Sequence, residues 1–523
     1  RKKAVFKKII TFSAFWLVLI LAVSSCVGEK LKILVVYPMP SRSHGNLGDG
    51  IVRQLLKAGH EITYITAFSY KNPPPNLLRS TLNYIFSAYT LNIGAVLNKD
   101  TFSNDLHRVK KLMISIATKT FEHENVQKLI NDPKEEFDLV IVEWMFSDLN
   151  AGFSSIFNCP FIWGSPVEIS SEILGLVDAM PNPAYSPDFS SYELPPFTFR
   201  RLIKKRQYNK HQTNFRYYDD VESDEFDRLV APVVERRGRQ APTYAEVRYN
   251  ASLILANSHV SAGPALTLPQ NYKPIGGYHI DENVKPLPEK IMDASKDGVI
   301  YFSMGSNLKS KDWPEAIKTG LLKMFGGLKQ TVLWKFEEML PDLPKNVHIL
   351  KWAPQPSILS HPNCVLFISH GGHLSTMETI HFGVPIIGIP VFGDQFINVQ
   401  RSVNKGYARK VDLNDAIVGE LQGAIAEVVG NPKYTQRVKE LSYIYHHRPT
   451  KPGAELVHWV EHVAHTRGAA HLRSPALHVP LYQRLYLDLV ALLLVIIIII
   501  AVLLKRILHA SKLVKFVIKQ KKY

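Results

Sequence analysis

The sequence predicts an α/β protein with two parallel, doubly wound sheets that face a cleft, followed by one transmembrane helix. Three observations lead to this fold class. Short apolar strands alternate with helical segments in two series, a stretch rich in proline and glycine separates the series at residues 271–290, and an uninterrupted apolar run lies at 489–504. Alternation at this spacing is typical of parallel sheets covered on both faces, which bind ligands at the carboxyl ends of their strands.

The first series occupies residues 29–270, which we expect to form an N-terminal Rossmann-like domain. It opens with a buried strand in "LKILVVYPMPSRSH" that ends in a polar loop, followed by the helix and strand of "LGDGIVRQLLKAGHEITYIT". Residues 71–130 have a helical tendency without a clear register. Further buried strands are predicted at Phe137–Met145, Cys159–Pro166 and Ala251–Ser258.

The second series occupies residues 291–445 and predicts a C-terminal Rossmann-like domain beyond the linker at 271–290. Residues 446–484 then contain a helix-like segment that leads towards the membrane. The strands expected in this second domain are Val299–Met304, Thr331–Phe336, Val347–Lys351, Val365–Ser369 and Pro385–Pro390.

Basic residues are concentrated at the two ends of the chain. Residues 1–8 hold five and residues 505–523 hold seven, with no acidic residue in either stretch, so the ends account for 12 of the net charge of +16. The remainder is close to balanced, which argues against a nucleic-acid-binding protein.

The same ends predict how the protein meets the membrane. Residues 1–28 have the basic start, apolar middle and small-residue end of a signal peptide, with a permanent N-terminal anchor as the alternative. Residues 485–504 are long enough to span a bilayer, and the basic tail at 505–523 is expected in the cytosol. The last residues, "KQKKY", resemble a dilysine retrieval signal. We therefore expect a single-pass type I protein of the endoplasmic reticulum membrane with a lumenal body, in which Asn250 of "NAS" is a glycosylation acceptor.

The stretch "FISHGGHLSTMETIHFGVP" reads as a strand, a glycine turn and a helix N-terminus. Such a turn binds phosphate, because Gly372 permits close approach of the backbone and Ser375 lies among the free N–H groups of the first helical turn. His370 adjoins the same turn. A zinc site of His370, His373 and His381 with Glu378 is the alternative, but no CxxC or HExxH pattern accompanies it.

Two neighbouring strand ends carry groups that suit the rest of a sugar nucleotide. "WAPQ" offers an aromatic plane at Trp352 and an amide at Gln355 for a base, and "GDQ" offers Asp394 and Gln395 for sugar hydroxyls. Glu378 lies one helical turn beyond the anion site, where it can accept hydrogen bonds from ribose. The chain has no DxD motif, so we expect neither a metal nor another cofactor, with the sugar nucleotide acting as a co-substrate.

The run from "WAPQPSILSHPNC" to "GIPVFGDQFINVQ" resembles the signature of the UDP-glycosyltransferases, and residues 29–475 are similar to that family throughout. The membrane segments match its animal, microsomal branch, and the whole is most like insect members. The resemblance implies a GT-B fold with the donor in the C-terminal domain. It also implies that Trp352 stacks on uracil beside Gln355, that Ser306, His370 and Ser375 hold the diphosphate, that Glu378 binds the ribose, and that Asp394 and Gln395 bind the transferred sugar.

On the acceptor side, the resemblance implies that His44, in the loop after the first strand, is the general base. It would take the proton of an acceptor hydroxyl that attacks the sugar in one inverting displacement, giving a β-glycoside. The family usually orients this histidine with an aspartate. Here the strand "FDLVIVE" ends in Glu143, which we expect to take that role, with Asp148 as the second choice.

The transferred sugar is expected to be glucose. Vertebrate glucuronosyl members carry a basic residue where this chain has Ala256, and a uronate carboxylate would need that residue. Membrane attachment suits small lipophilic acceptors such as phenols, steroids, plant toxins, odorants or pigments, in detoxification or metabolite conjugation. We expect residues 70–130 and 165–250 to form the acceptor pocket. Two alternatives stay open, namely a glycolipid synthase that uses a membrane lipid such as ceramide and a catalytically weak UDP-sugar-binding partner protein. The sequence also leaves homo- or hetero-oligomers open.

Overall fold

The computed structural model describes residues 29–69, 77–81, 106–178, 194, 198, 216–281, 284, 291–306, 308 and 310–521. The predicted signal peptide lies outside the described residues, as do parts of the segments 70–130 and 165–250 that are expected to form the acceptor pocket. The described residues up to Arg473 form one compact unit, and those from Ser474 form a second. Each unit is described by itself.

The first sheet has seven parallel strands in the order β3-β2-β1-β4-β5-β6-β7. The strand order reverses between β1 and β4, which makes the carboxyl ends of these two strands the expected ligand site. The strands are β1 (Lys32–Tyr37), β2 (Glu61–Thr66), β3 (Leu77–Thr81), β4 (Leu139–Glu143), β5 (Phe161–Ser165), β6 (Leu253–Ala256) and β7 (Tyr272–Pro274).

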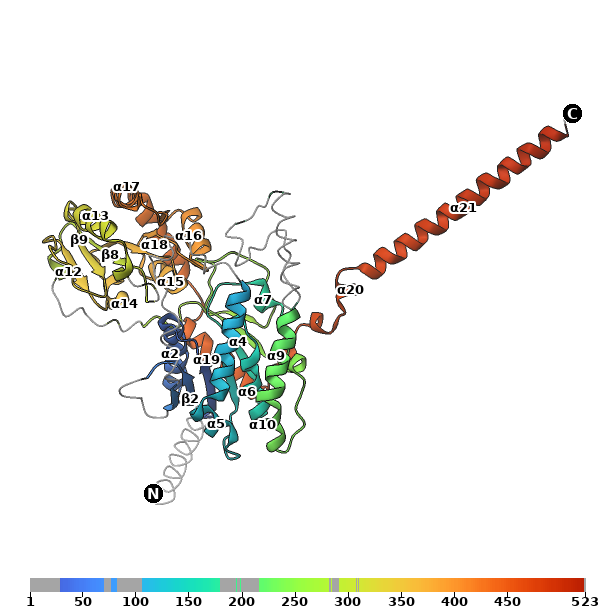
Figure 1. Cartoon of the computed structure of the whole chain (residues 1–523), viewed down its shortest axis with the longest axis horizontal. Coiled ribbons are helices and arrows are strands. Elements are labelled where there is room, and N and C mark those ends of the chain that lie inside the picture. The colour runs from blue at the N-terminus through green and yellow to red at the C-terminus, as the bar shows by residue number, and fades with distance from the viewer. Residues whose placement is uncertain are drawn as a thin grey trace, which may run out of the picture. The chain divides into compact units, whose positions relative to one another are not determined.

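Helices and short 3₁₀ turns connect the strands of the first sheet. Figure 1 shows several of them packed around it. They are α2 (Arg42–Lys57), α4 (Leu106–Glu122), α5 (Glu124–Asn131), η2 (Leu149–Ala151), α6 (Gly152–Phe157), α7 (Ser171–Leu174), α9 (Arg216–Leu229), α10 (Ala231–Arg236) and α11 (Tyr244–Arg248).

The second sheet has six parallel strands in the order β10-β9-β8-β11-β12-β13, so its order reverses between β8 and β11. Helices α13 and α17 lie together beside this sheet (Figure 1). Its strands are β8 (Val299–Ser303), β9 (Thr331–Lys335), β10 (Val347–Leu350), β11 (Cys364–Ser369), β12 (Ile386–Gly388) and β13 (Ala408–Lys410). Its helices and turns are α12 (Ile291–Ala294), η3 (Ser310–Asp312), α13 (Glu315–Gly326), α14 (Gln355–Leu359), α15 (His373–Phe382), α16 (Gln395–Asn404), α17 (Ile417–Gly430) and α18 (Pro432–His446).

Each sheet separates two hydrophobic cores, because successive side chains of a strand point to opposite faces. In β1, Leu34 and Val36 belong to one core, whereas Ile33 and Val35 belong to the core on the other face. The second sheet alternates in the same way between its own two cores. Burial on both faces explains why these strands are almost continuously apolar in sequence.

The fold confirms the predicted pair of parallel sheets, and every strand predicted from an apolar run is present. Three strands were not predicted. β3 lies in the segment that reads as helical, β7 lies inside the predicted linker, and β13 has only three residues. β7 ends in Pro274 at the edge of its sheet, where a missing N–H is tolerated, so the first sheet extends beyond the predicted domain end at residue 270.

The segment after the second sheet does not simply lead to the membrane. Helix α19 (Pro452–His465) returns to the first sheet and lies against α2 (Figure 1). Its Leu456, Val460 and Val463 are completely buried in the same core as β1. This helix therefore fastens the chain that follows the second sheet onto the first domain.

The second unit contains η5 (Pro475–His478), α20 (Leu481–Arg484) and α21 (Leu487–Gln520), while η4 (Ala470–Leu472) belongs to the first unit. Helix α21 has 34 residues, and its part Leu487–Ile518 is long and apolar enough to cross a membrane. The sequence predicts a span of 485–504 and a separate basic tail. The helix instead continues through most of that tail, because residues 505–520 contain neither proline nor glycine to end it.

Candidate active site

His44 and Glu143 meet at the point where the strand order of the first sheet reverses. Glu143 is the last residue of β4, and Oε1 of its carboxylate is hydrogen-bonded to Nδ1 of His44. The side chain of Glu143 is 2% exposed and that of His44 is 14% exposed. Since a carboxylate accepts, Nδ1 of His44 donates, which leaves the Nε2 lone pair available to take a proton.

The prediction that His44 lies in a loop is wrong, because it lies in a helix. His44 lies in the first turn of α2, which begins at Arg42. The helix starts earlier than the sequence indicates because the polar run "SRSHGN" has no apolar periodicity to reveal it. A rigid element therefore supports the histidine.

Asp148, the second choice as partner of His44, contacts other groups. Its Oδ1 accepts a hydrogen bond of 2.8 Å from Nε1 of Trp144, and its Oδ2 lies 2.6 Å from a nitrogen of Arg248. Both members of this ion pair are largely buried. Asp148 therefore stabilises the loop after β4 through Trp144 and Arg248. Glu143 is the carboxylate that contacts His44.

A buried acid, Glu222 of α9, stabilises the loop after β4 through hydrogen bonds. Its carboxylate accepts from Oγ of Ser147 at 2.6 Å and from the backbone N–H of Asp148 at 3.1 Å, and it pairs with Nζ of Lys110 at 2.5 Å. Burial raises the pKa of Glu222, and Lys110 opposes that rise. This network could not be predicted from the sequence, because its members come from three distant segments.

A small pocket adjoins Glu143. Three methionines contribute to its apolar wall, namely Met39 after β1, Met113 of α4 and Met145 after β4. The polar residues at its surface are Glu143, Ser147 and Asn150. The segment 70–130, predicted to form part of the acceptor pocket, thus contributes part of this wall through α4.

The phosphate turn predicted at His370 lies at the reversal point of the second sheet. His370 follows β11, Gly371 has a φ of 80°, and Gly372 caps the N-terminus of α15. Ser375 lies in the first turn of that helix and is buried. The turn therefore has the free N–H groups and helix dipole that favour an anion.

The loop after β8 contacts the ring of His370. A Cβ atom on Gly305 would lie 2.5 Å from Cε1 of His370, and Gly305 has a φ of +79°, so glycine is required there. Ser306 follows and is half-buried. Burial and the nearby Lys335 lower the pKa of His370 to about 4. At neutral pH His370 is therefore an uncharged hydrogen-bonding group.

Lys335 is a residue of this site that sequence reasoning missed. It ends β9, and its Nζ donates to the backbone carbonyl of Gly305 at 2.7 Å and contacts Glu337 at 3.2 Å. A lysine at the end of the apolar run "TVLWK" was the available signal. It is the cation that acts on His370, so it supplies positive charge close to the phosphate turn.

Gln355, Ser375 and Glu378 form one cluster beside this turn. Nε2 of Gln355 donates to Glu378 at 2.6 Å and to Oγ of Ser375 at 3.2 Å. Burial raises the pKa of Glu378 to about 7, and the hydrogen bond from Gln355 opposes that rise. Trp352, which precedes the cluster, is 64% exposed. The structure thus presents an uncovered aromatic ring next to buried polar groups.

Asp394 and Gln395 lie at the start of α16. Oδ2 of Asp394 accepts from Nδ2 of Asn398 at 2.8 Å, and the same Nδ2 lies 3.2 Å from the carbonyl oxygen of Gly371. Asp394 is thereby linked to the phosphate turn. Gln395 uses Oε1 to accept from the backbone N–H groups of Val391 and Phe392, so its carbonyl orients the turn before the helix.

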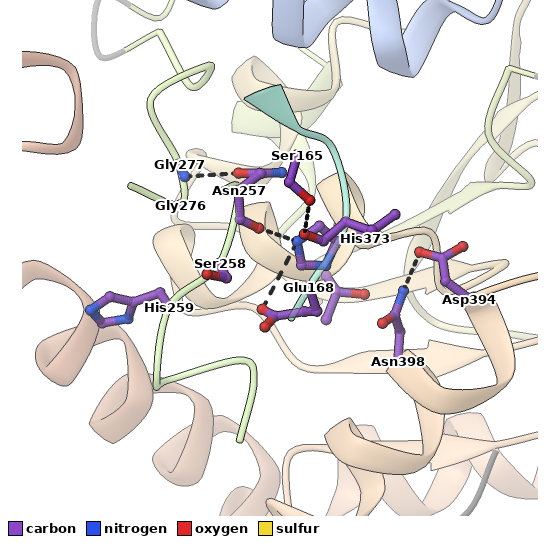
Figure 2. Close-up of polar contacts among 12 residues, drawn as sticks. Ser165, Glu168, Asn257, Ser258, His259, Gly276, Gly277, His373, Asp394 and Asn398 are labelled. Carbon is purple, nitrogen blue, oxygen red and sulfur yellow. Dashed lines mark hydrogen bonds and ion pairs between the residues drawn. The ribbon is translucent and has the colours of Figure 1, made fainter. Parts of the chain in front are cut away.

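His373 joins the phosphate turn to the first domain (Figure 2). Its Nε2 donates to the backbone carbonyl of Asn257, just beyond β6, and lies 3.9 Å from the carboxylate of Glu168. His381 is engaged at the other end of α15, where its ring packs against Tyr445. Among the described residues, no group of three histidine, cysteine or acidic side chains is arranged as metal ligands.

Ala256 and Asn250 flank this region of the first domain. Ala256 ends β6, is completely buried, and precedes the residue that contacts His373. Asn250 is exposed, and its Oδ1 accepts a hydrogen bond of 2.5 Å from Arg473. The strand end that carries Ala256 therefore adjoins the phosphate turn, whereas the glycosylation sequon lies on the surface.

The chain is similar in sequence to known sugar-transferring enzymes. UDP-glucosyltransferase 2 of Dactylopius coccus is 32% identical over 499 residues, which cover 92% of this chain and 93% of that protein. UDP-glucuronosyltransferase 2B15 of Rattus norvegicus is 28% identical over 536 residues, covering 96% and 98%.

The solved structures that resemble this chain are GT-B glycosyltransferases. A UDP-glucosyltransferase from Polygonum tinctorium superposes with a TM-score of 0.55 at 14% identity, covering 84% of this chain and 99% of that one. CalG4, the calicheamicin glycosyltransferase, superposes with a TM-score of 0.54 at 15% identity, covering 83% and 98%. These likenesses show the fold.

The sequence model of one family, described as UDP-glucoronosyl and UDP-glucosyl transferase, matches residues 32–523. That match spans both sheets, the His44–Glu143 pair, the phosphate turn and the C-terminal apolar helix. The chain therefore belongs to the UDP-glycosyltransferase family, whose members transfer a sugar from a UDP-sugar donor.

Proposed function

We propose that this enzyme transfers glucose from UDP-glucose to a hydroxyl group of a small lipophilic acceptor, with inversion at the sugar carbon. The observation that carries the proposal is the His44–Glu143 pair beside an apolar pocket. A histidine held by a buried carboxylate is oriented as a base, and the pocket offers an apolar molecule a place next to it.

The reaction follows from the tautomer of His44. Nε2 takes the proton of the acceptor hydroxyl as its oxygen forms a bond to C1 of glucose. The bond from C1 to the diphosphate oxygen breaks, and UDP leaves with that electron pair. Glu143 offsets the positive charge that develops on the imidazole. One displacement on an α-linked donor gives a β-glucoside.

The donor would lie along the carboxyl ends of the second sheet. Trp352 would stack on uracil with Gln355 beside it, and Glu378 would bind the ribose. Ser306, His370, Ser375 and the N–H groups of α15 would hold the diphosphate, and no metal is needed in this scheme. Because His370 is neutral, it contributes a hydrogen bond, and Lys335 provides the nearby positive charge. Asp394 and Gln395 would bind the hydroxyls of glucose.

The choice of glucose rests on two observations. The end of β6 adjoins the phosphate turn and carries Ala256 instead of a basic residue that could pair with a uronate. The relative from Dactylopius coccus is named a UDP-glucosyltransferase, although the rat relative is named a UDP-glucuronosyltransferase. The test supplies both donors to membranes that contain the enzyme. Acceptor-dependent UDP release with UDP-glucose supports the proposal, and release with UDP-glucuronate alone contradicts it.

The apolar helix α21 fits a single-pass membrane protein. We propose that it anchors the enzyme in the endoplasmic reticulum membrane with the body in the lumen and the basic end in the cytosol. Lys505 and Arg506 support this orientation, as does the exposed sequon at Asn250. Lipophilic acceptors partition into the same bilayer, which would raise their concentration near the enzyme.

Replacing Trp352 with alanine should weaken UDP binding by about 5- to 150-fold, since stacking of a base on an aromatic ring contributes roughly 1–3 kcal/mol. The melting temperature should not change, because the side chain is 64% exposed. Titration calorimetry with UDP measures the first effect. Met339, which is also 64% exposed, provides the control: Met339→Ala should bind UDP normally. Unchanged affinity in Trp352→Ala would exclude the stacking role.

Binding of UDP-glucose should weaken as the pH falls below about 7, because Glu378 has a pKa of about 7 and its ionised carboxylate accepts hydrogen bonds from ribose more strongly than the neutral acid does. Glu378→Gln should remove this pH dependence. UDP-glucose is the suitable ligand, since the terminal phosphate of UDP would itself titrate near pH 6, as phosphate monoesters do. Identical pH profiles of affinity in the wild type and Glu378→Gln would show that Glu378 does not bind the donor.

The same shift predicts the pH dependence of stability. The pKa of Glu378 is higher in the folded protein than the usual 4.5. The folded state therefore holds this proton where the unfolded state has lost it, and the contribution to stability falls as the pH rises from about 4.5 through about 7. Glu378→Gln should show a smaller loss of melting temperature over that range.

A further inference from the structure

We propose that Asn150 is a specificity residue that recognises a second hydrogen-bond donor on the acceptor, at a distance from the hydroxyl that receives the sugar. This inference rests on the proposed function, because it assigns the acceptor to the pocket beside Glu143. It goes further by stating what the acceptor must carry besides an apolar body and one reactive hydroxyl.

The first observation is the composition of the pocket. Its wall contains Met39, Met113 and Met145, whose flexible and polarisable side chains adapt to flat apolar molecules. The wall alone would accept many lipophilic molecules and discriminate little among them.

The second observation is the state of the three polar residues that line the pocket. Glu143 is hydrogen-bonded to His44, and the hydroxyl of Ser147 donates to Glu222 at 2.6 Å. Asn150 is 6% exposed, and its Oδ1 is buried without a hydrogen-bond partner among the described residues. Of these three residues, Asn150 is therefore the one whose side-chain oxygen accepts no hydrogen bond within the described part of the chain.

A buried carbonyl oxygen without a partner is unfavourable, and native proteins retain few of them. Asn150 lies in η2, and the preceding loop is fixed by Glu222, which accepts from both Ser147 and the backbone of Asp148. These hydrogen bonds thus fix the backbone that leads into Asn150. A bound acceptor with a hydroxyl or N–H group would complete the missing hydrogen bond, while Glu143 and His44 serve the reacting hydroxyl at another part of the same wall.

The test compares acceptors that differ only in the second group. 2-Naphthol, the isomeric naphthalenediols and their monomethyl ethers form a suitable set. With the wild-type enzyme and UDP-glucose, at least one diol should exceed 2-naphthol in kcat/KM by about tenfold. The corresponding methyl ether should lose this advantage, because it accepts hydrogen bonds but does not donate them. A wild-type enzyme that treats naphthol, diol and ether alike overturns the inference.

Asn150→Leu replaces the amide with an apolar group that branches at the same atom, and it should remove the preference for the diol while retaining transfer to 2-naphthol. Asn150→Ala serves the same comparison if the leucine variant fails to fold. Met113→Leu is the matched control, since it changes the apolar wall and should preserve the preference. A preference that survives both changes at Asn150 rules out this residue as its cause. Absence of transfer to every acceptor by the wild type would instead count against the proposed function.

Discussion

Replacing His44 with alanine should reduce acceptor-dependent UDP release by about 10²–10⁴-fold, the range typical of a lost general base. The acceptor hydroxyl is a poor nucleophile until its proton is removed, and Nε2 of His44 is the basic atom that Glu143 holds in position. UDP binding should not change, because the residues proposed for the donor lie on the second sheet. Initial rates of UDP release and calorimetric titration with UDP measure the two quantities.

His44→Gln separates the base from its hydrogen bond. The glutamine amide can donate to Glu143 as Nδ1 does, but it takes up no proton at neutral pH. We expect the glutamine variant to be as inactive as the alanine variant. Activity close to the wild type in either would mean that another group removes the proton.

The second large effect distinguishes the two acids near His44. Glu143→Gln should lower kcat by about 10²–10⁴-fold, because a neutral amide holds the imidazole without offsetting its charge and permits the wrong tautomer. Its melting temperature should change little. Rates at saturating acceptor and thermal melts of the purified variant measure these effects.

Asp148→Asn should show the opposite pattern. It leaves Arg248 largely buried without one of its carboxylate partners, a change that costs about 3 kcal/mol of folding free energy. The remaining pair with Asp219 at 2.7 Å and relief of repulsion with Glu222 place the cost at the low end of the usual range. The folded fraction should keep kcat within about threefold. A stable but inactive Asp148→Asn would indicate that Asp148, and not Glu143, supports His44 in catalysis.

The sequence predicted the sheets well because their strands are buried on both faces and read as apolar runs such as "KILVVY" and "LVIVE". It failed for β3, β7 and β13, which have five or three residues and lie near the edges of the sheets. Edge strands are stabilised by one neighbour and carry little apolar signal. The return of α19 to the first sheet also has no local signature, since it depends on contacts between distant segments.

The residues of the candidate site likewise fall into those that could be predicted from the sequence and those that could not. The phosphate turn could be predicted because glycine spacing and a helix start are local features, and Glu143 could be placed because it ends a strand. Lys335 and the network of Lys110, Glu222 and Arg248 could not, since each acts through residues far away in sequence. The uncommitted carbonyl of Asn150 was likewise invisible, because only the folded structure shows which buried groups have partners.

The measurement that tests the central claim most directly is UDP release by membranes that contain either the wild type or His44→Gln. UDP-glucose and UDP-glucuronate are supplied in turn, each with a panel of phenols, steroids and flavonoids. The account predicts release by the wild type with UDP-glucose in the presence of acceptor, and almost none by the variant. Equal release by both proteins, or no release by a wild type that binds UDP, would contradict it.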